Sequence, residues 1–150
     1  LLNIMQPDRA YFGEKDAQQL RVVRQLVRDL NLPMEIVACR TVRDPDGLAL
    51  SSRNAYLSDE ERADALALSR GLRLVEAAFA SGERDADRLR ALVRGEMEAA
   101  PLVRVDYVSL SDDETLEELS GAIEPPALLS LAAHVGQTHL IDNVTLGHRE

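Results

Sequence analysis

Residues 9–39 read RAYFGEKDAQQLRVVRQLVRDLNLPMEIVAC, and this stretch decides the fold. Residues 9–12 predict a short buried strand, residues 16–30 predict a helix, and residues 34–39 predict a second strand. A strand, a helix and a strand within about 30 residues are typical of a right-handed parallel crossover. The stretch therefore predicts the last piece of a doubly wound α/β sheet.

The predicted helix has recognisable ends. Asp16 and Gln19 stand at the spacing of a capping box at its start, and Asn31 and Pro33 stop it. Apolar residues recur at helical spacing and define one buried face: Leu20, Val23, Leu26, Val27 and Leu30.

Beyond residue 40 the pattern changes to that of a small α+β domain. Residues 40–57 predict a polar loop, and Gly136-Gln137 fit a two-residue hairpin turn with Gly first. Two helices are expected to pack on a three-stranded, mainly antiparallel sheet. The predicted elements are a helix capped by Ser58 and Glu61 and ending near Ala80, a helix capped by Asp85 with Leu89, Leu92, Val93 and Met97 inward, a strand at 103–107, a short helix at 115–119, and strands at 127–135 and 138–146.

Composition excludes several classes of function. The net charge is −9, from 17 basic and 26 acidic residues, so nucleic-acid binding is not expected. No apolar run approaches the roughly 20 residues of a membrane span. Cys39 is the only cysteine, which excludes an internal disulfide, fits a reducing cytoplasm, and is interpreted as a core residue at the end of a strand.

The first candidate site is the run Phe12–Asp16, at the carboxyl end of a predicted parallel strand. Ligands bind at that edge of open α/β sheets, and the free amides of the following helix favour anions. Gly13 allows close approach to the backbone, and Lys15 suits phosphate oxygens. The alternative is that Asp16 only caps the helix and Lys15 is solvated.

The second candidate is the run Asp46–Asn54. Two hydroxyls beside an arginine, Ser51, Ser52 and Arg53, can donate several hydrogen bonds to phosphate oxygens, and Gly47 would let the loop move over a ligand. The alternative is a solvated loop in which a serine caps a turn.

Together the two runs resemble one family, the pantothenate synthetases. Phe12–Leu20 match the family's Phe-Gly-Glu-Lys-Asp-x-Gln-Gln-Leu run, and Asp46–Leu57 match its Asp-Gly-Leu-Ala-(Met/Leu)-Ser-Ser-Arg-Asn-x-Tyr-Leu run. Leu140–Asn143 resemble the family's last strand. The resemblance implies the β-α-β end of a Rossmann-like nucleotidyl-transferase domain followed by the small α+β domain.

The resemblance also implies an activity. Members of the family use ATP and Mg²⁺ to adenylate pantoate, releasing pyrophosphate, and the amine of β-alanine then displaces AMP to give pantothenate. The roles implied here are ATP binding and catalysis by Lys15, Ser51, Ser52 and Arg53, further ATP contacts from Gly13, Asp16 and the backbone of Val42, and pantoate binding by Gln19.

The family's His-x-Gly-His motif, its magnesium ligand and much of its pantoate and β-alanine sites belong to an N-terminal part that is not in this sequence. The chain alone is therefore expected to be inactive, and a homodimer is expected for the full-length protein. The predicted division is an ATP-binding piece at 1–41, a hinge and phosphate-binding loop at 42–58, and a C-terminal lid at 59–150.

Two other functions stay open at this point. The acidic second part, with a balance of −10 (9 − 19) over residues 59–150, could serve as an interaction or dimerisation module. The chain could also belong to another adenylate-forming nucleotidyl transferase. A metal site at His134 and His139 is not expected, because no cysteine or carboxylate stands at ligand spacing. His148 lies in a tail, and the acidic residues of 112–118 are interpreted as a solvated surface.

Overall fold

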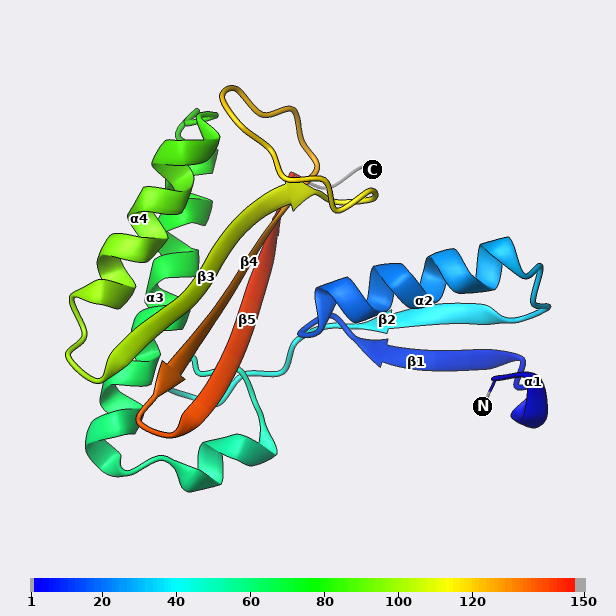
Figure 1. Ribbon diagram of the computed structural model, residues 1–150, viewed down its shortest axis with the longest axis horizontal. Helices are drawn as coiled ribbons and strands as arrows, with labels where there is room; N and C mark the ends of the chain where they lie inside the picture. Colours follow the sequence, from blue (N-terminus) through cyan, green and yellow to red (C-terminus); the bar gives the residue numbers. More distant parts are fainter. Residues whose placement is uncertain (1, 148–150) are drawn as a thin grey trace. The chain divides into compact units, whose positions relative to one another are not determined.

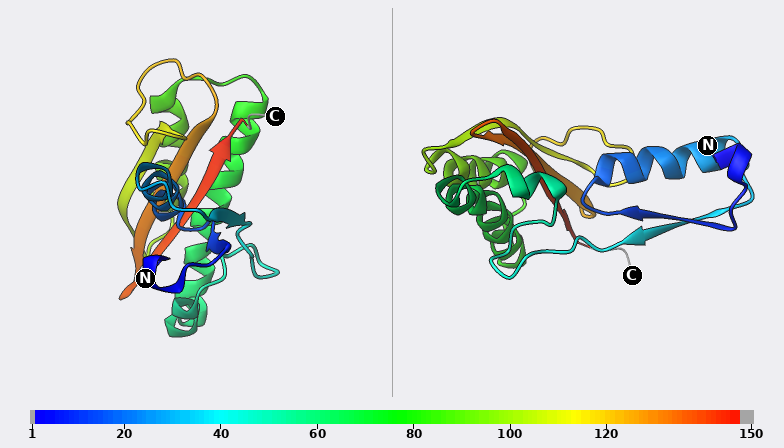
Figure 2. Two further views of the ribbon diagram at one scale, coloured as in Figure 1. Left: turned by 90° about the vertical axis from the view of Figure 1, so that its right-hand side faces the viewer. Right: turned by 90° about the horizontal axis from the view of Figure 1, so that it is seen from below.

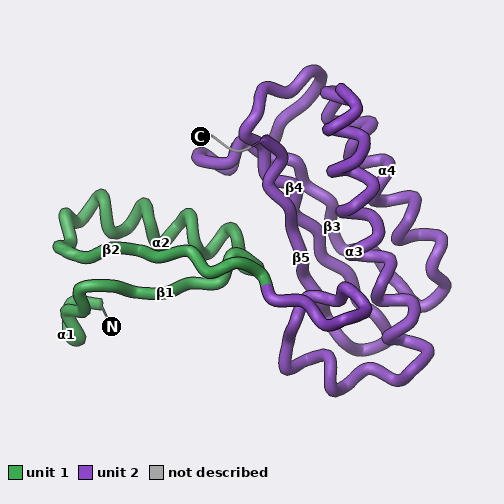
Figure 3. Tube along the Cα trace, turned by 180° about the vertical axis from the view of Figure 1, so that it is seen from behind, with its two compact units in different colours: residues 1–41 green, residues 42–150 purple. Residues whose placement is uncertain are grey.

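The computed structural model describes residues 2–147, so the predicted tail at His148 lies outside the described residues. The chain divides into two compact units, Leu1–Thr41 and Val42–Glu150, which Figure 3 shows in different colours. Among residues 2–147, no helix has both the length and the apolar character that crossing a bilayer requires.

Unit 1 is the predicted β-α-β arrangement. A short helix α1 (Leu2–Met5) precedes strand β1 (Arg9–Gly13), helix α2 (Ala17–Asp29) and strand β2 (Glu35–Cys39). Strands β1 and β2 pair in parallel from Arg9 opposite Glu35 to Gly13 opposite Cys39.

Two burial predictions for unit 1 are wrong. The first strand is not buried, since Tyr11 is 64% exposed, and Cys39 is exposed rather than part of the core. The reason is that a two-stranded sheet covered by one helix can shield little surface, and only Ala17 and Leu20 are buried on α2.

Helix α2 starts and ends where the sequence predicts. The Asp16 carboxylate accepts a hydrogen bond from the Gln19 amide at 3.2 Å, which is one half of the predicted capping box. The Asp16 amide instead donates to the Gly13 carbonyl oxygen at 3.3 Å. Asn31, with φ at +47°, follows the last turn in the left-handed conformation that ends many helices.

Unit 2 has two helices on one face of an antiparallel sheet (Figure 1). Strands β3 (Val103–Asp112), β4 (Ala127–Val135) and β5 (Thr138–Leu146) lie in the order β3-β4-β5. Helices α3 (Asp59–Ala80) and α4 (Ala86–Glu98) pack side by side on that face, as Figure 2 shows from two further directions. A 3-10 helix, η1 (Ser52–Tyr56), precedes them.

The core of unit 2 fills the layer between helices and sheet. The Ser58–Glu61 capping box forms as predicted and fixes the start of α3. Leu92, predicted to face inward, is 41% exposed because the α4 stripe that meets the sheet is narrower than predicted. The largest fully buried side chains that α3, α4 and β4 contribute to this layer are Leu68, Val75, Leu89, Val93, Met97, Leu129, Leu131 and Val135.

The predicted short helix at 115–119 does not form. The Asp112 carboxylate accepts hydrogen bonds from the Glu114 and Thr115 amides at 2.9 and 2.7 Å, a local turn that competes with helix formation. Leu116 then adopts a φ of +62°, and the chain returns along β3 with a bridge between Ser111 and Glu118. Strand β3 is also longer than the predicted 103–107.

Candidate functional site

The first cluster of predicted site residues lies at the carboxyl end of β1. The Glu14 amide donates to the Cys39 carbonyl oxygen at 2.8 Å, so the turn that holds Lys15 is tied to the neighbouring strand. Lys15 is half-buried in this turn, between the strand and α2. A Cβ atom placed on Gly13 would meet no atom within 4 Å, so the backbone there is open to a ligand.

Asp16 and Gln19 complete this cluster. The Asp16 carboxylate is engaged in capping α2, which confirms the capping role considered for it. The Gln19 side chain is exposed on the third residue of the helix. Lys15, Gln19 and the backbone amides at the start of α2 therefore lie at one strand-to-helix edge. Open α/β sheets bind anionic ligands at such edges.

The second cluster lies in unit 2, and its loop is more ordered than predicted. Residues 42–50 form a small hairpin, in which the Leu50 amide donates to the Val42 carbonyl oxygen at 2.8 Å and the Asp44 amide to the Leu48 carbonyl oxygen at 2.9 Å. Gly47 sits at the turn with a φ of +99°. The segment predicted as a polar loop is therefore an ordered hairpin, and movement of this hairpin over a ligand stays a prediction.

The sequence contained a signal for this hairpin. Asp44-Pro45-Asp46-Gly47 has proline at the second position of a type I turn and glycine two residues later in the left-handed region. The Gly47 amide donates to the Asp44 carbonyl oxygen at 2.8 Å and closes the turn. Leu48 and Ala49 are buried, so the hairpin packs on unit 2 rather than standing in solvent.

Two arginines hold the hairpin. Arg43 forms a two-pronged ion pair with Asp142 on β5, at 2.6 and 3.0 Å. Arg62 on α3 donates to Asp44 and to Asp46, each at 2.8 Å. The Asp142 hydrogen bond raises the pKa of Arg43, and bonds to Asp44 and Asp46 raise the pKa of Arg62.

Asp46 is held in its charged form. The Leu48 amide donates to its carboxylate at 3.1 Å, and this bond, followed by the contact with Arg62, lowers the pKa of Asp46. The Asp46 carboxylate therefore bonds both the backbone of its own turn, at Leu48, and Arg62 of helix α3.

The predicted phosphate-binding residues begin directly after the hairpin. The Ser51 hydroxyl oxygen accepts from the Arg53 amide at 3.2 Å and caps η1. The Arg53 guanidinium donates to the His139 carbonyl oxygen on β5 at 3.3 Å, while Ser52 is exposed. Ser51, Ser52 and Arg53 are thus gathered in one helical turn whose first serine also has the capping role that the sequence left open.

Val42, predicted to contact adenine through its backbone, is the first residue of unit 2 and is 64% exposed. Its carbonyl oxygen is engaged in the hairpin. The predicted site residues therefore form two groups, one in each unit: Gly13, Lys15, Asp16 and Gln19 in unit 1, and Val42, Ser51, Ser52 and Arg53 in unit 2.

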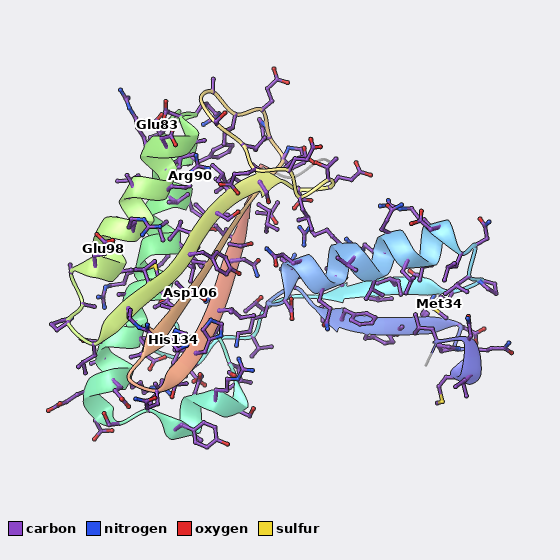
Figure 4. All side chains as sticks on the ribbon, in the orientation of Figure 1. Met34, Glu83, Arg90, Glu98, Asp106 and His134 are labelled. Atoms are coloured by element: carbon purple, nitrogen blue, oxygen red, sulfur yellow. The ribbon has the colours of Figure 1, made fainter. Side chains whose placement is uncertain are left out.

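The two histidines of the sheet lie close to each other. No group of three or more His, Cys, Asp or Glu side chains in residues 2–147 could hold a metal ion. The His134 and His139 rings lie 4.7 Å apart, and the His139 ring is 3.2 Å from the Asp106 carboxylate. Figure 4 shows Asp106 and His134 on the three-stranded sheet.

Comparisons with known proteins give the family. The model of the family "Pantoate-beta-alanine ligase" matches residues 1–145. A pantothenate synthetase of Roseiflexus sp. strain RS-1 is 55% identical over 146 residues, which are 97% of this chain and 52% of that protein.

Solved structures agree. The pantothenate synthetase of Thermus thermophilus superposes with a TM-score of 0.89 at 42% identity, covering 97% of this chain and 52% of that one. A pantoate-β-alanine ligase of Francisella tularensis, solved in complex with β-γ ATP and β-alanine, has a TM-score of 0.63 at 27% identity and covers 96% and 46%. This chain spans about half the length of the relatives it matches. On the family match over residues 1–145, the chain belongs to the pantoate–β-alanine ligase family.

Proposed function

We propose that this chain is the C-terminal part of a ligase that condenses pantoate with β-alanine through a pantoyl adenylate, releasing AMP and pyrophosphate. The observation that carries the proposal is the family match over residues 1–145, which includes both the Phe12–Leu20 and the Asp46–Leu57 runs. The Francisella relative, with ATP and β-alanine in its complex, supports ATP and β-alanine as substrates.

The chemistry of the two clusters supports contacts with different parts of ATP. Lys15 neutralises phosphate charge that grows as pyrophosphate leaves, while the open backbone at Gly13 and the Asp16 carboxylate contact the ribose. Gln19, exposed one turn into α2, contacts pantoate. Arg53 and the Ser52 hydroxyl, exposed on η1, donate to phosphate oxygens together with Ser51.

Further roles are proposals of the same kind. Residues 1–41 hold nucleotide and pantoate, residues 42–58 serve as hinge and phosphate-binding segment with Val42 near adenine, and residues 59–150 act as a lid that excludes water from the adenylate. Mg²⁺ is proposed as a cofactor of the full-length protein beside ATP, and none of residues 2–147 is proposed as its ligand. The homodimer remains a prediction for the full-length protein.

A coupled assay for AMP release tests the proposal on two proteins, the 150-residue chain and the full-length protein that carries it. We expect AMP release on addition of ATP, pantoate and β-alanine from the full-length protein, and none from the 150-residue chain. Activity of the full-length protein with an amine other than β-alanine, or none with these substrates, would contradict the assignment. AMP release by the 150-residue chain would show that the proposed incompleteness is wrong.

Site variants sharpen the test. Lys15→Ala and Arg53→Ala in the full-length protein are each expected to lower kcat/KM for ATP by about 10²-fold or more, the usual cost of removing one donor to transition-state charge. Arg94→Ala is the matched control, because this arginine is exposed on α4, where it forms an ion pair with Glu98 at 3.6 Å. Equal effects of all three substitutions would contradict the site.

A further inference from the structure

Asp142 is the one charged residue among the buried polar side chains of the described residues, with 4% of its surface exposed. It lies on β5 directly opposite Leu131 of β4. Because opposed residues of an antiparallel pair point to the same face, and Leu131 belongs to the core, the carboxylate lies on the helix-facing side of the sheet.

Its partner is Arg43, from the hairpin of residues 42–50. Both carboxylate oxygens accept from the guanidinium, and one also accepts from the Asn143 amide at 2.9 Å. Replacing a buried ion pair by apolar residues of similar volume is often neutral or stabilising, so stability alone does not account for a charge at this position. A two-pronged pair does fix the position and orientation of both partners.

The pair fixes the hairpin. The same Arg43 guanidinium donates to the Gly47 carbonyl oxygen at 3.3 Å, so one side chain joins β5 to the turn. Arg62 joins the turn to α3 through Asp44 and Asp46. The hairpin is therefore joined to the rest of unit 2 at two elements, β5 and α3.

The hairpin in turn fixes the residues that follow it. The Asn54 side-chain amide donates to the Ala49 carbonyl oxygen at 3.2 Å, which joins η1 to the hairpin. The Arg53 guanidinium donates to the His139 carbonyl oxygen of β5, the strand that also holds Asp142. The Ser51–Arg53 segment thus has its place set by contacts with the hairpin and with β5.

We propose that Asp142 and Arg43 are positioning residues that hold Ser51–Arg53 in the arrangement that binds the phosphates of ATP. The inference rests on the proposed function for its ligand, but the ordering of the segment can be measured without one. Neither residue needs to touch the substrate, and both act through the hairpin.

Amide hydrogen exchange of the 150-residue chain tests the ordering. Asp142→Asn keeps the shape of the side chain and removes its charge. We expect exchange at the Leu50, Arg53 and Asn54 amides to become about tenfold faster or more, while exchange in β4 changes much less. Val93→Ala, a core substitution in α4 at its contact with Gly71 of α3, is the control and should not affect the segment selectively.

Arg43→Lys serves as a second variant, because it keeps the charge at a partly exposed position and loses the two-pronged geometry. It is expected to produce the same local change if Asp142→Asn does not fold. Unchanged exchange at the segment in the folded variant, or a change no more local than that of Val93→Ala, would overturn the proposal.

Kinetics of the full-length protein separate this inference from the proposed function. Asp142→Asn is expected to raise KM for ATP by about tenfold or more and to leave KM for pantoate unchanged. In Asp142→Glu, KM for ATP should return part of the way to the value of the parent protein. Equal changes in both KM values would overturn the positioning role. If the parent protein has no ATP-dependent activity, the proposed function fails, and the exchange result still decides whether Asp142 orders the segment.

Discussion

At the scale of single residues, Gly47 decides whether the 42–50 hairpin can close. Its φ of +99° lies in the region that side chains with a Cβ rarely adopt. A Cβ atom there would also lie 2.9 Å from a terminal nitrogen of Arg73, although that flexible side chain can move aside. The backbone conformation is therefore the main constraint at this position.

We predict that Gly47→Ala lowers the free energy of unfolding by about 1–3 kcal/mol, the usual cost of a strained backbone position. Gly47→Asn should lower it by less, because asparagine tolerates the left-handed region better. Both substitutions place the same Cβ beside Arg73, so their difference isolates the backbone contribution. Urea unfolding measures it, and equal losses for the two variants would contradict this explanation.

At the scale of elements, the sequence predicted most of the fold. Helices with strong caps, such as Ser58 with Glu61 and Asp85 before α4, were placed correctly because a cap and a periodic apolar face agree at each. Residues 115–119 were misjudged because the Asp112 side chain orders a turn, and such competition is weakly marked in composition.

The candidate site likewise has features that the sequence predicts and features that it does not. The strand-to-helix edge at Lys15 could be predicted, since it follows from local pattern and strand direction. The contacts of Arg53 with His139 and of Arg43 with Asp142 join residues 86 and 99 positions apart, and no local pattern contains them. A lone aspartate in a strand with buried apolar residues was the available signal for Asp142.

Two glycines inside helices allow a matched prediction on packing. A Cβ on Gly71 of α3 would lie 3.2 Å from Val93 Cγ1 and 3.4 Å from its Cα, whereas one on Gly95 of α4 would meet no atom within 4 Å. Gly95→Ala should raise the free energy of unfolding by about 0.5–1 kcal/mol through helix propensity. Gly71→Ala should raise the free energy of unfolding by less. Gly71→Leu should lower it by about 1–3 kcal/mol, because the larger side chain overpacks the contact with Val93.

Thermal or urea unfolding of the three variants measures these differences. A gain from Gly71→Ala equal to that of Gly95→Ala would mean that α3 and α4 separate easily, contrary to the close contact between them.

The connection between α3 and α4 predicts a dependence on pH. The Glu83 carboxylate accepts from the Arg84 and Asp85 amides at 2.8 and 2.9 Å, and these bonds, that of Asp85 first, lower the pKa of Glu83. Figure 4 shows Glu83 at the start of α4. A lowered folded-state pKa contributes stability that is present above the unfolded-state value, about 4.3, and is lost as pH falls through the folded-state value.

Glu83→Gln should therefore flatten the fall of the melting temperature between about pH 5 and pH 3. Repeating the titration in about 1 M NaCl is the control, because salt screens the Glu83–Arg88 ion pair at 3.5 Å but leaves the backbone bonds in place. A difference between parent and variant that disappears in salt would show that the ion pair, and not the amides, is responsible.

At the scale of the whole molecule, the two units differ in how much core each contains. Of the largest fully buried side chains in the described residues, only Leu20 belongs to unit 1, and the rest belong to unit 2. Tyr11, Val22 and Leu30 of unit 1 are more than half exposed. A parallel sheet is normally covered on both faces, and domains of about 40 residues rarely fold without additional support.

We therefore predict that residues 42–150 produced alone fold cooperatively, with a urea midpoint close to that of the main transition of the 150-residue chain. Residues 1–41 alone should show little ordered structure by circular dichroism, because burial of Ala17 and Leu20 cannot offset the entropy of ordering the segment. Gly71→Leu supplies the control, since it should lower the midpoint equally in both proteins if the core of unit 2 is complete by itself. A large decrease in the urea midpoint on removing residues 1–41 would show instead that the stability of unit 2 depends on them.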